Sequence, residues 1–270
     1  MRKLGYIFLV LGLLFILGIA NILRHGFRHA ERAECNISTL PASVLPGAGP
    51  LRIAVIGDAH LMNVPMSWAL HYLRKEKPDI IFFVGDLVTG DTRFSRSRTY
   101  IHFFETLKTV APVYAILGNH DYEKLASLER VYAEAGVPLL RNRAIEWTSP
   151  AGKNIRIIGL GDWNEGDEKP ALCMQLKGKE KLPVILLSHD ANSRWLLRRY
   201  DWNLMLSGHT HGGQLGNPFT GQYIYPRDSM VAGLYDFEKE HHIFITRGLG
   251  ALFKLRFFCP PEVNILDIPE

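Results

Sequence analysis

Five short motifs of aspartate, histidine and asparagine recur along the chain, each after a short apolar run. They are Asp58-Ala59-His60, Gly85-Asp86, Gly118-Asn119-His120-Asp121, Ser188-His189 and Gly208-His209-Thr210-His211. A single aspartate at a strand end is more often a turn or helix cap. Carboxylates and imidazoles that converge in one cleft, however, repel or stay unpaired unless a cation joins them. These groups suit borderline divalent ions such as Mn, Fe or Zn, so the ordered set predicts a metal site.

The spacing within the motifs supports this interpretation. Asp58 and His60 are two residues apart, and so are His209 and His211. In an extended segment this period places both side chains on one side, so each pair is expected to reach one site. In four of the five motifs a glycine directly precedes the first candidate ligand, and we expect these glycines to form the tight strand-to-loop turns.

The elements that must position these residues begin at residue 51. Short β-type runs alternate with segments of helical periodicity, which predicts an α/β fold with its site at the carboxyl ends of the strands. The predicted strands are 51–56, 79–84, 113–117, 155–160, 184–188, 203–207, 242–246 and 263–268, and the predicted helices are 66–77, 97–110, 122–135 and 192–200. No repeat or second linker interrupts residues 51–270, which we therefore expect to form one catalytic domain.

The N-terminal segment has the character of a membrane anchor. Residues 5–23 carry no charge and as a helix would span about 28 Å, close to the thickness of a bilayer core. The small-x-small pattern of a cleaved signal peptide is poor, which favours an uncleaved anchor over residues 1–33. Both flanks are basic, so the positive-inside rule does not orient the helix. Residues 34–50, rich in Pro, Gly and Ser, are expected to be a linker.

Composition excludes several classes of protein. The chain of 270 residues is 47% hydrophobic, which excludes a disordered polymer. Five of the 31 basic side chains and one of the 27 acidic ones lie in residues 1–33, so the remaining chain is neutral and no nucleic-acid partner is expected. Cys35, Cys173 and Cys259 are widely spaced and predict isolated thiols rather than a thiolate metal site.

The order of the motifs resembles that of the calcineurin-like metallophosphoesterases over about four-fifths of the chain. The motifs are D-x-H, GD, GNHD, a later lone His and GHTH. The ending is similar to a bacterial membrane-associated branch of that family that contains phosphodiesterases. It comprises HTHGGQ at 209–214, RGLG at 247–250, Arg256-Phe257 and Pro260-Pro261-Glu262. The resemblance implies a four-layer sandwich, in which helices flank two mixed sheets, and two divalent ions, Mn first, with Fe, Zn or Mg as alternatives.

The resemblance also assigns roles residue by residue. One ion would be held by Asp58, His60, Asp86 and His211, and the other by Asp86, Asn119, His189 and His209. A hydroxide shared between the ions would be the nucleophile. His120 would face the leaving group or a phosphoryl oxygen, and Asp121 would fix the His120 ring by accepting its other N–H. Asn119 and His120 would also contact the substrate. Arg247 and Arg256 are further candidates for substrate binding because guanidinium groups suit phosphate, and the alternative for both is a salt bridge.

Anchor and resemblance together point to a phosphodiester or pyrophosphate substrate, and a membrane lipid fits the anchor. UDP-2,3-diacylglucosamine, the lipid A precursor hydrolysed by relatives in this family, is the named candidate. The expected location is a bacterial inner or cytoplasmic membrane, with no obligate protein partner. The alternatives are a non-catalytic scaffold of the same fold and a soluble nucleotide or cyclic-nucleotide phosphodiesterase.

Two departures from the family pattern bear on these expectations. Gly85-Asp86-Leu87-Val88 lacks the arginine that Ser/Thr protein phosphatases carry just after this motif, which disfavours a protein phosphatase. His189-Asp190-Ala191-Asn192 stands where the branch usually has His-Asn-Pro-Asp, so the contact that follows the candidate ligand can differ.

Overall fold

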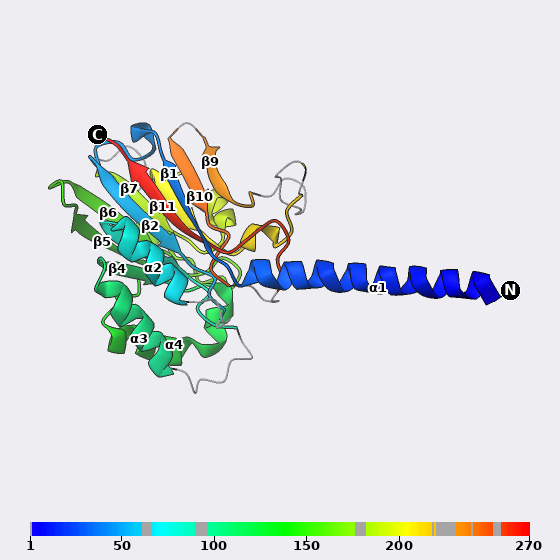
Figure 1. Cartoon of the computed structure of the whole chain (residues 1–270). Helices are drawn as coiled ribbons and strands as arrows, with labels where there is room; N and C mark the ends of the chain where they lie inside the picture. Colours follow the sequence, from blue (N-terminus) through cyan, green and yellow to red (C-terminus); the bar gives the residue numbers. More distant parts are fainter. Residues whose placement is uncertain are drawn as a thin grey trace.

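The computed structural model describes residues 2–60, 66–89, 97–175, 182–217, 219, 230–238, 240–250 and 255–270. Two mixed β-sheets lie face to face in the described chain (Figure 1). The first has the strand order β1-β11-β2-β3-β4 and the second the order β5-β6-β7-β8-β10-β9. The strands of the first sheet are β1 (Glu34–Thr39), β11 (Glu262–Ile268), β2 (Leu51–Ile56), β3 (Ile80–Val84) and β4 (Val113–Ile116). Those of the second are β5 (Arg143–Thr148), β6 (Asn154–Gly159), β7 (Val184–Leu187), β8 (Leu204–Ser207), β10 (His241–Ile245) and β9 (Gly233–Phe237).

The strands that carry the motifs run parallel. β2, β3 and β4 are parallel neighbours in the first sheet, and β7 and β8 in the second. Antiparallel pairs occur where β11 meets β2 and at the β5 and β9 edges. Because parallel strands end at the same edge of a sheet, the segments after β2, β3, β4, β7 and β8 can meet at one place.

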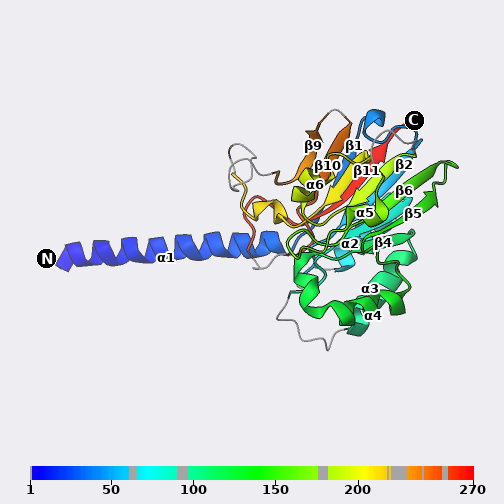
Figure 2. The same cartoon turned by 180° about the vertical axis from the view of Figure 1, so that it is seen from behind.

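Alternating side chains build a separate core on each face of the sheets. In β3, Ile80, Phe82 and Val84 are buried between the two sheets, whereas Ile81 and Phe83 pack on the helical side. That side is covered by α2 (Met66–Glu76), α3 (Ser97–Lys108) and α4 (Leu125–Ala135), and the short α5 (Pro170–Cys173) and α6 (Arg194–Leu197) lie outside the second sheet (Figure 2). The result is the predicted four-layer α/β sandwich, because both faces of each sheet are apolar and must be covered.

All eight predicted strands are confirmed, with ends within one residue of those observed. The edge strands β5 and β9 were not predicted, since their half-exposed residues lack a continuous apolar run. The helix predicted over 192–200 is reduced to a 3₁₀ turn (Ala191–Ser193) and α6. The helix predicted over 122–135 begins as a 3₁₀ turn (Asn119–Lys124) before α4.

The prediction of a linker over 34–50 is wrong. β1 pairs in parallel with the whole of β11, from Glu34 opposite Glu262 to Thr39 opposite Asp267. Val44, Leu45 and Ala48 then pack into the core between the sheets. The Pro- and Gly-rich composition belongs to the tight turns after β1, while the strand itself covers an edge that β11 would otherwise expose.

The N-terminal segment is one helix, α1 (Arg2–Ala30), which projects from the sandwich with its N-terminus far from the domain (Figures 1 and 2). An 18-residue stretch within Tyr6–Ala30 has a mean hydropathy of 2.6, and this part of the helix is long and apolar enough to cross a membrane. The helix meets the domain at Gly26, where a β-carbon would lie 2.8 Å from the Leu255 side chain and 2.6 Å from the Phe257 ring. The three cysteines are free thiols, as predicted.

Candidate metal centre

The segments that follow the parallel strands bring all seven candidate metal ligands together. Each lies within hydrogen-bond or ion-pair distance of another member of the set: Asp58, His60, Asp86, Asn119, His189, His209 and His211. Three of the five motifs come from the first sheet and two from the second, so the cluster lies where the two sheets meet. The residues that the motifs single out thus lie together in space.

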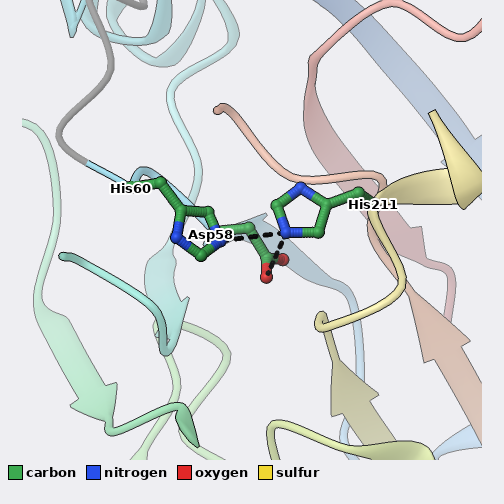
Figure 3. A group of neighbouring side chains, drawn as sticks. All are labelled: Asp58, His60 and His211. Carbon is green, nitrogen blue, oxygen red and sulfur yellow. Dashed lines mark hydrogen bonds and ion pairs between the residues drawn. The ribbon is translucent and has the colours of Figure 1, made fainter. Parts of the chain in front are cut away.

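Asp58, His60 and His211 form one group of buried ligands (Figure 3). The Nε2 atoms of the two imidazoles are 2.9 Å apart, and Asp58 Oδ1 lies 3.6 Å from His211 Nε2. The two rings are stacked, with centroids 4.7 Å apart. His211 Nδ1 lies 3.3 Å from the Gly250 carbonyl oxygen, and donating to it would leave Nε2 free to bind an ion.

Asp58, Asp86 and His189 form a second buried group. His189 Nε2 lies 3.2 Å from Asp86 Oδ2 and 3.9 Å from Asp58 Oδ1. His189 Nδ1 lies 2.7 Å from the Val84 carbonyl oxygen, to which it can donate its proton. His189 Nε2 is then a buried acceptor with no hydrogen bond of acceptable geometry in the described chain, as expected of a metal ligand.

Asn119 and His209 approach the same cluster from its more open side. Asn119 Oδ1 and His209 Nδ1 are 3.0 Å apart, and the two imidazoles of His189 and His209 meet edge to face. Asp86 belongs to the second group and also approaches the first, with Oδ2 3.2 Å from His189 Nε2 and 3.5 Å from His60 Nε2. One carboxylate oxygen is thus shared between histidines of the two groups.

These separations fit divalent ions. Ligand atoms about 2.0–2.2 Å from an ion, in octahedral or tetrahedral geometry, lie roughly 3–3.5 Å from one another. The pairs above are separated by 2.9–3.6 Å, apart from Asp58 and His189. The mixed oxygen and nitrogen donors are those that Mn, Fe and Zn accept. The chain therefore presents two candidate groups of ligands for divalent ions.

Burial and neighbouring charges shape the protonation of the cluster. Burial raises the pKa of Asp58 to about 7 and lowers the pKa of His60 to about 4. Burial also opposes the ionised form of Asp86, but His189 outweighs it and holds the Asp86 pKa well below its usual range. Burial similarly lowers the pKa of His211. Neutral imidazoles can bind a metal ion directly, and a divalent cation favours the ionised carboxylates against their burial.

The backbone of the ligands adopts a conformation that the sequence did not reveal. Asp58, His60, Asp86, His209 and His211 all have positive φ, between 47° and 71°. Such conformations cost on the order of 1–3 kcal/mol each and cluster at functional sites. The two side chains of each D-x-H or H-x-H pair are therefore aimed by left-handed turns, and the prediction of an extended segment is wrong.

The glycines before the ligands mostly serve close packing instead. Only Gly85, at φ 92°, takes the left-handed turn expected of these glycines. A β-carbon at Gly85 would lie 2.5 Å from the Gly118 nitrogen, and one at Gly118 would collide with the Asp86 carboxylate. These two glycines let the segments after β3 and β4 approach closely enough to share Asp86.

His120 and Asp121 lie beside the cluster, but their arrangement differs from the prediction. The half-buried His120 ring meets His60 edge to face at 5.1 Å, and its backbone N–H donates to Asp86 Oδ1. Asp121 is fully buried and accepts the backbone N–H groups of Val88 and Gly118, 3.1 and 3.0 Å away. Asp121 thus ties together two ligand-bearing loops, whereas it was predicted to orient the His120 ring.

Arg247 and Arg256, the candidates for substrate binding, are engaged in buried contacts within the chain. Arg256 is fully buried, and its guanidinium donates to the carbonyl oxygens of His211, Arg247, Gly250 and Cys259. Arg247 forms a buried ion pair with Glu262, with both Nε and a terminal nitrogen 2.7 Å from one carboxylate oxygen. Guanidinium groups occupied in this way hold the loops around His211 and are not free for a phosphoryl group.

One neighbour of the site was missed as a functional residue. Asp190 Oδ2 lies 3.7 Å from His209 Nε2 and accepts a hydrogen bond from Asn164 Nδ2 at 3.2 Å. This places a carboxylate behind a candidate ligand, where it can fix the ring and leave Nδ1 for the metal. The signal in the sequence was the departure from His-Asn-Pro-Asp at 189–192.

A two-sheet sandwich with buried carboxylate and imidazole clusters at the strand ends defines a metal-dependent phosphoric ester hydrolase. The profile of the family "Calcineurin-like phosphoesterase" matches residues 51–213. The chain belongs to this family, as its motifs predicted.

Curated relatives match most of the chain. It is 35% identical over 231 residues to "Phosphodiesterase YaeI" of Escherichia coli, covering 82% of this chain and 83% of that protein. It is 26% identical over 276 residues to "UDP-2,3-diacylglucosamine pyrophosphatase LpxG" of Chlamydia muridarum, covering 80% and 83%. Among solved structures, the Haemophilus influenzae NAD nucleotidase NadN aligns with a TM-score of 0.51 at 20% identity, over 74% of this chain and 45% of that one. The last likeness concerns the fold alone.

Proposed function

We propose that the chain is a dinuclear phosphodiesterase or pyrophosphatase that acts on a membrane-associated phosphorylated substrate. The proposed ligands of one ion are Asp58, His60, Asp86 and His211, and those of the other are Asp86, Asn119, His189 and His209. The observation that carries this proposal is the position of Asp86. Its Oδ1 accepts the His120 N–H, while its Oδ2 faces His60 and His189 from the two groups.

The proposed chemistry divides between the ions and the chain. Two bound divalent ions, Mn first, supply a nucleophile at neutral pH and stabilise the charge of an in-line displacement. Asn119 presents its amide at the open side of the cluster, where it can help to place a phosphoryl oxygen. His120 is half-buried beside His60, and we assign it the protonation of the leaving oxygen or the stabilisation of its charge.

We assign α1 the role of an anchor in a bacterial inner or cytoplasmic membrane. The segment that packs on α1 at Gly26 also carries Arg256, whose guanidinium contacts the His211 carbonyl oxygen. This short connection supports a cluster close to the end of the helix and hence a substrate held in the membrane. UDP-2,3-diacylglucosamine is the candidate, because LpxG relatives bear its name.

Hydrolysis by the full chain in neutral detergent micelles, with and without Mn²⁺, tests the proposal. We expect metal-dependent hydrolysis of bis(p-nitrophenyl) phosphate and metal-dependent release of UMP from UDP-2,3-diacylglucosamine. His120→Ala should slow both reactions, whereas His102→Ala, which removes an exposed imidazole on α3, should not. Diester hydrolysis without UMP release would refute the lipid candidate alone. If no metal binds, the catalytic proposal fails and the scaffold alternative gains support.

A further inference from the structure

A cavity of about 490 Å³ lies where α1 joins the domain. Its lining combines cationic or ionisable side chains with aromatic ones: His25, Arg28, His29, Arg32, Trp68 and Tyr72. The first four come from α1 and the residues just after it, and the last two come from α2. None of these residues belongs to the seven candidate metal ligands.

The two arginines that line this cavity have no carboxylate partner among the described residues. Within the described part of the chain, neither Arg28 nor Arg32 forms an ion pair. The carboxylate that also lines the cavity, Glu34, lies 3.5 Å from Arg247 and is thereby engaged. His29 Nδ1 is buried without a hydrogen-bond partner among the described residues. The cavity thus has positive charge and an unused polar atom, which favour an anionic ligand.

Stacked rings form two walls of the cavity. The imidazoles of His25 and His29 are parallel, with centroids 4.3 Å apart, and Phe258 packs against both. Trp68 and Tyr72 stack on α2 with centroids 6.1 Å apart. Since tryptophan and tyrosine concentrate at the level of lipid headgroups, these walls suit the boundary between bilayer and water.

The position along α1 agrees with that depth. If residues 5–23 cross the hydrocarbon core, Arg28 lies five residues further, or about 7 Å along the helix axis. The headgroup layer on each side of a bilayer is roughly 5–7 Å thick. The guanidinium of Arg28 is therefore at the level of the lipid phosphates.

We propose that this cavity binds the phosphate-bearing headgroup of an anionic membrane phospholipid. Arg28 and Arg32 donate to the phosphate, the imidazole of His29 supplies a further polar contact, and Trp68 rests against the glycerol region. The proposal rests on the assignment of α1 as an anchor and is independent of the phosphoesterase reaction. Lipid binding can therefore be measured without any turnover.

Calorimetric titration of the full chain in neutral detergent micelles tests this site. The probe is a short-chain phosphatidylglycerol, compared with the zwitterionic phosphatidylcholine of the same chain length. We expect saturable binding of the phosphatidylglycerol at one site, weakened about tenfold by Arg28→Gln and by Arg32→Gln, the loss typical of one charge-assisted contact. The matched control is Arg24→Gln. Arg24 lies about one helical turn before Arg28 on α1 and does not line the cavity. This control should change the affinity by less than about twofold.

Three results would overturn the assignment. An equal loss in Arg24→Gln would show general attraction to the basic segment, and equal binding of phosphatidylcholine would show that the phosphate charge is not recognised. In a separate arm, inorganic phosphate that displaces the lipid at equal concentration would identify a site for free phosphate. Thermal unfolding in lipid-free micelles checks folding, and Arg32→Gln, an exposed position beyond the helix, carries the test if Arg28→Gln is unstable.

Discussion

Replacing Asp86 by asparagine is the sharpest test of the shared position between the two ligand groups. The amide keeps an oxygen that can accept the His120 N–H, as Asp86 Oδ1 does at 3.0 Å. It replaces Oδ2, which lies 3.2 Å from His189 Nε2 and 3.5 Å from His60 Nε2, by an uncharged NH₂ group. A unit charge pair 4 Å apart is worth about 4 kcal/mol at an effective dielectric of 20. A hundredfold loss of rate needs only about 2.7 kcal/mol, so Asp86→Asn should lose at least two orders of magnitude.

The assay is Mn-dependent hydrolysis of bis(p-nitrophenyl) phosphate together with the number of ions bound per chain. We expect Asp86→Asn to bind fewer ions than the unsubstituted chain and to recover little activity at high metal concentration. Asp236→Asn, which neutralises a carboxylate that is 83% exposed on β9, is the matched control and should leave both quantities unchanged. Full activity with two ions bound in Asp86→Asn would refute the shared role of this carboxylate.

Three further substitutions test other parts of the site. Asp190→Ala removes the carboxylate 3.7 Å from His209 Nε2 and should lower metal affinity about 10–100-fold in a metal titration. The metal affinity of Asp190→Asn should lie closer to that of the unsubstituted chain. Arg256→Lys should lower the unfolding temperature without raising KM, since Arg256 serves buried carbonyl groups; a raised KM at unchanged stability would restore a substrate role. Burial raises the pKa of Glu168 from 4.5 to about 7. Between pH 4.5 and pH 7 the folded chain therefore binds more protons than the unfolded chain, and the free energy of unfolding falls as pH rises through this range. Glu168→Gln should remove about 3 kcal/mol of this decline in unfolding measurements between pH 4.5 and pH 8, and an unchanged slope would contradict the assignment.

The inner strands and the clustering of the candidate ligands could be predicted from the sequence because both depend on local pattern. β2 and β3 are almost entirely buried, which gives them a continuous apolar run. One polar residue after such a strand can be a simple cap, but the ordered set of five motifs indicates a site. β1 was missed because its residues are half-exposed and its stability comes from pairing with β11, more than 220 residues later in the chain. No window of local sequence carries that information.

The roles of Arg247, Arg256 and Asp121 could not be predicted for a different reason. The types of these residues allow either a ligand contact or a buried structural contact, and only burial and partners decide between them. Arg256 and Asp121 are fully buried, and their terminal guanidinium nitrogens and carboxylate oxygens hydrogen-bond to backbone groups. The candidate ligands have positive φ angles, and strained loops of this kind persist only where surrounding groups fix them. Buried hydrogen bonds from Arg256 and Asp121 to the backbone supply this support.

Arg256 also connects the two parts of the molecule that the sequence treated separately. Its backbone N–H donates to the Gly26 carbonyl oxygen of α1 at 3.1 Å, while its guanidinium donates to carbonyl oxygens around the candidate ligand His211. Gly26 has no space for a β-carbon against Phe257, so the helix is held at a fixed place on the segment that carries Arg256. One buried residue therefore links the loop of the candidate ligand His211 to the end of α1. A helix joined in this way has a fixed position relative to the ligand cluster, whereas a helix on a flexible linker would leave the cluster free to turn.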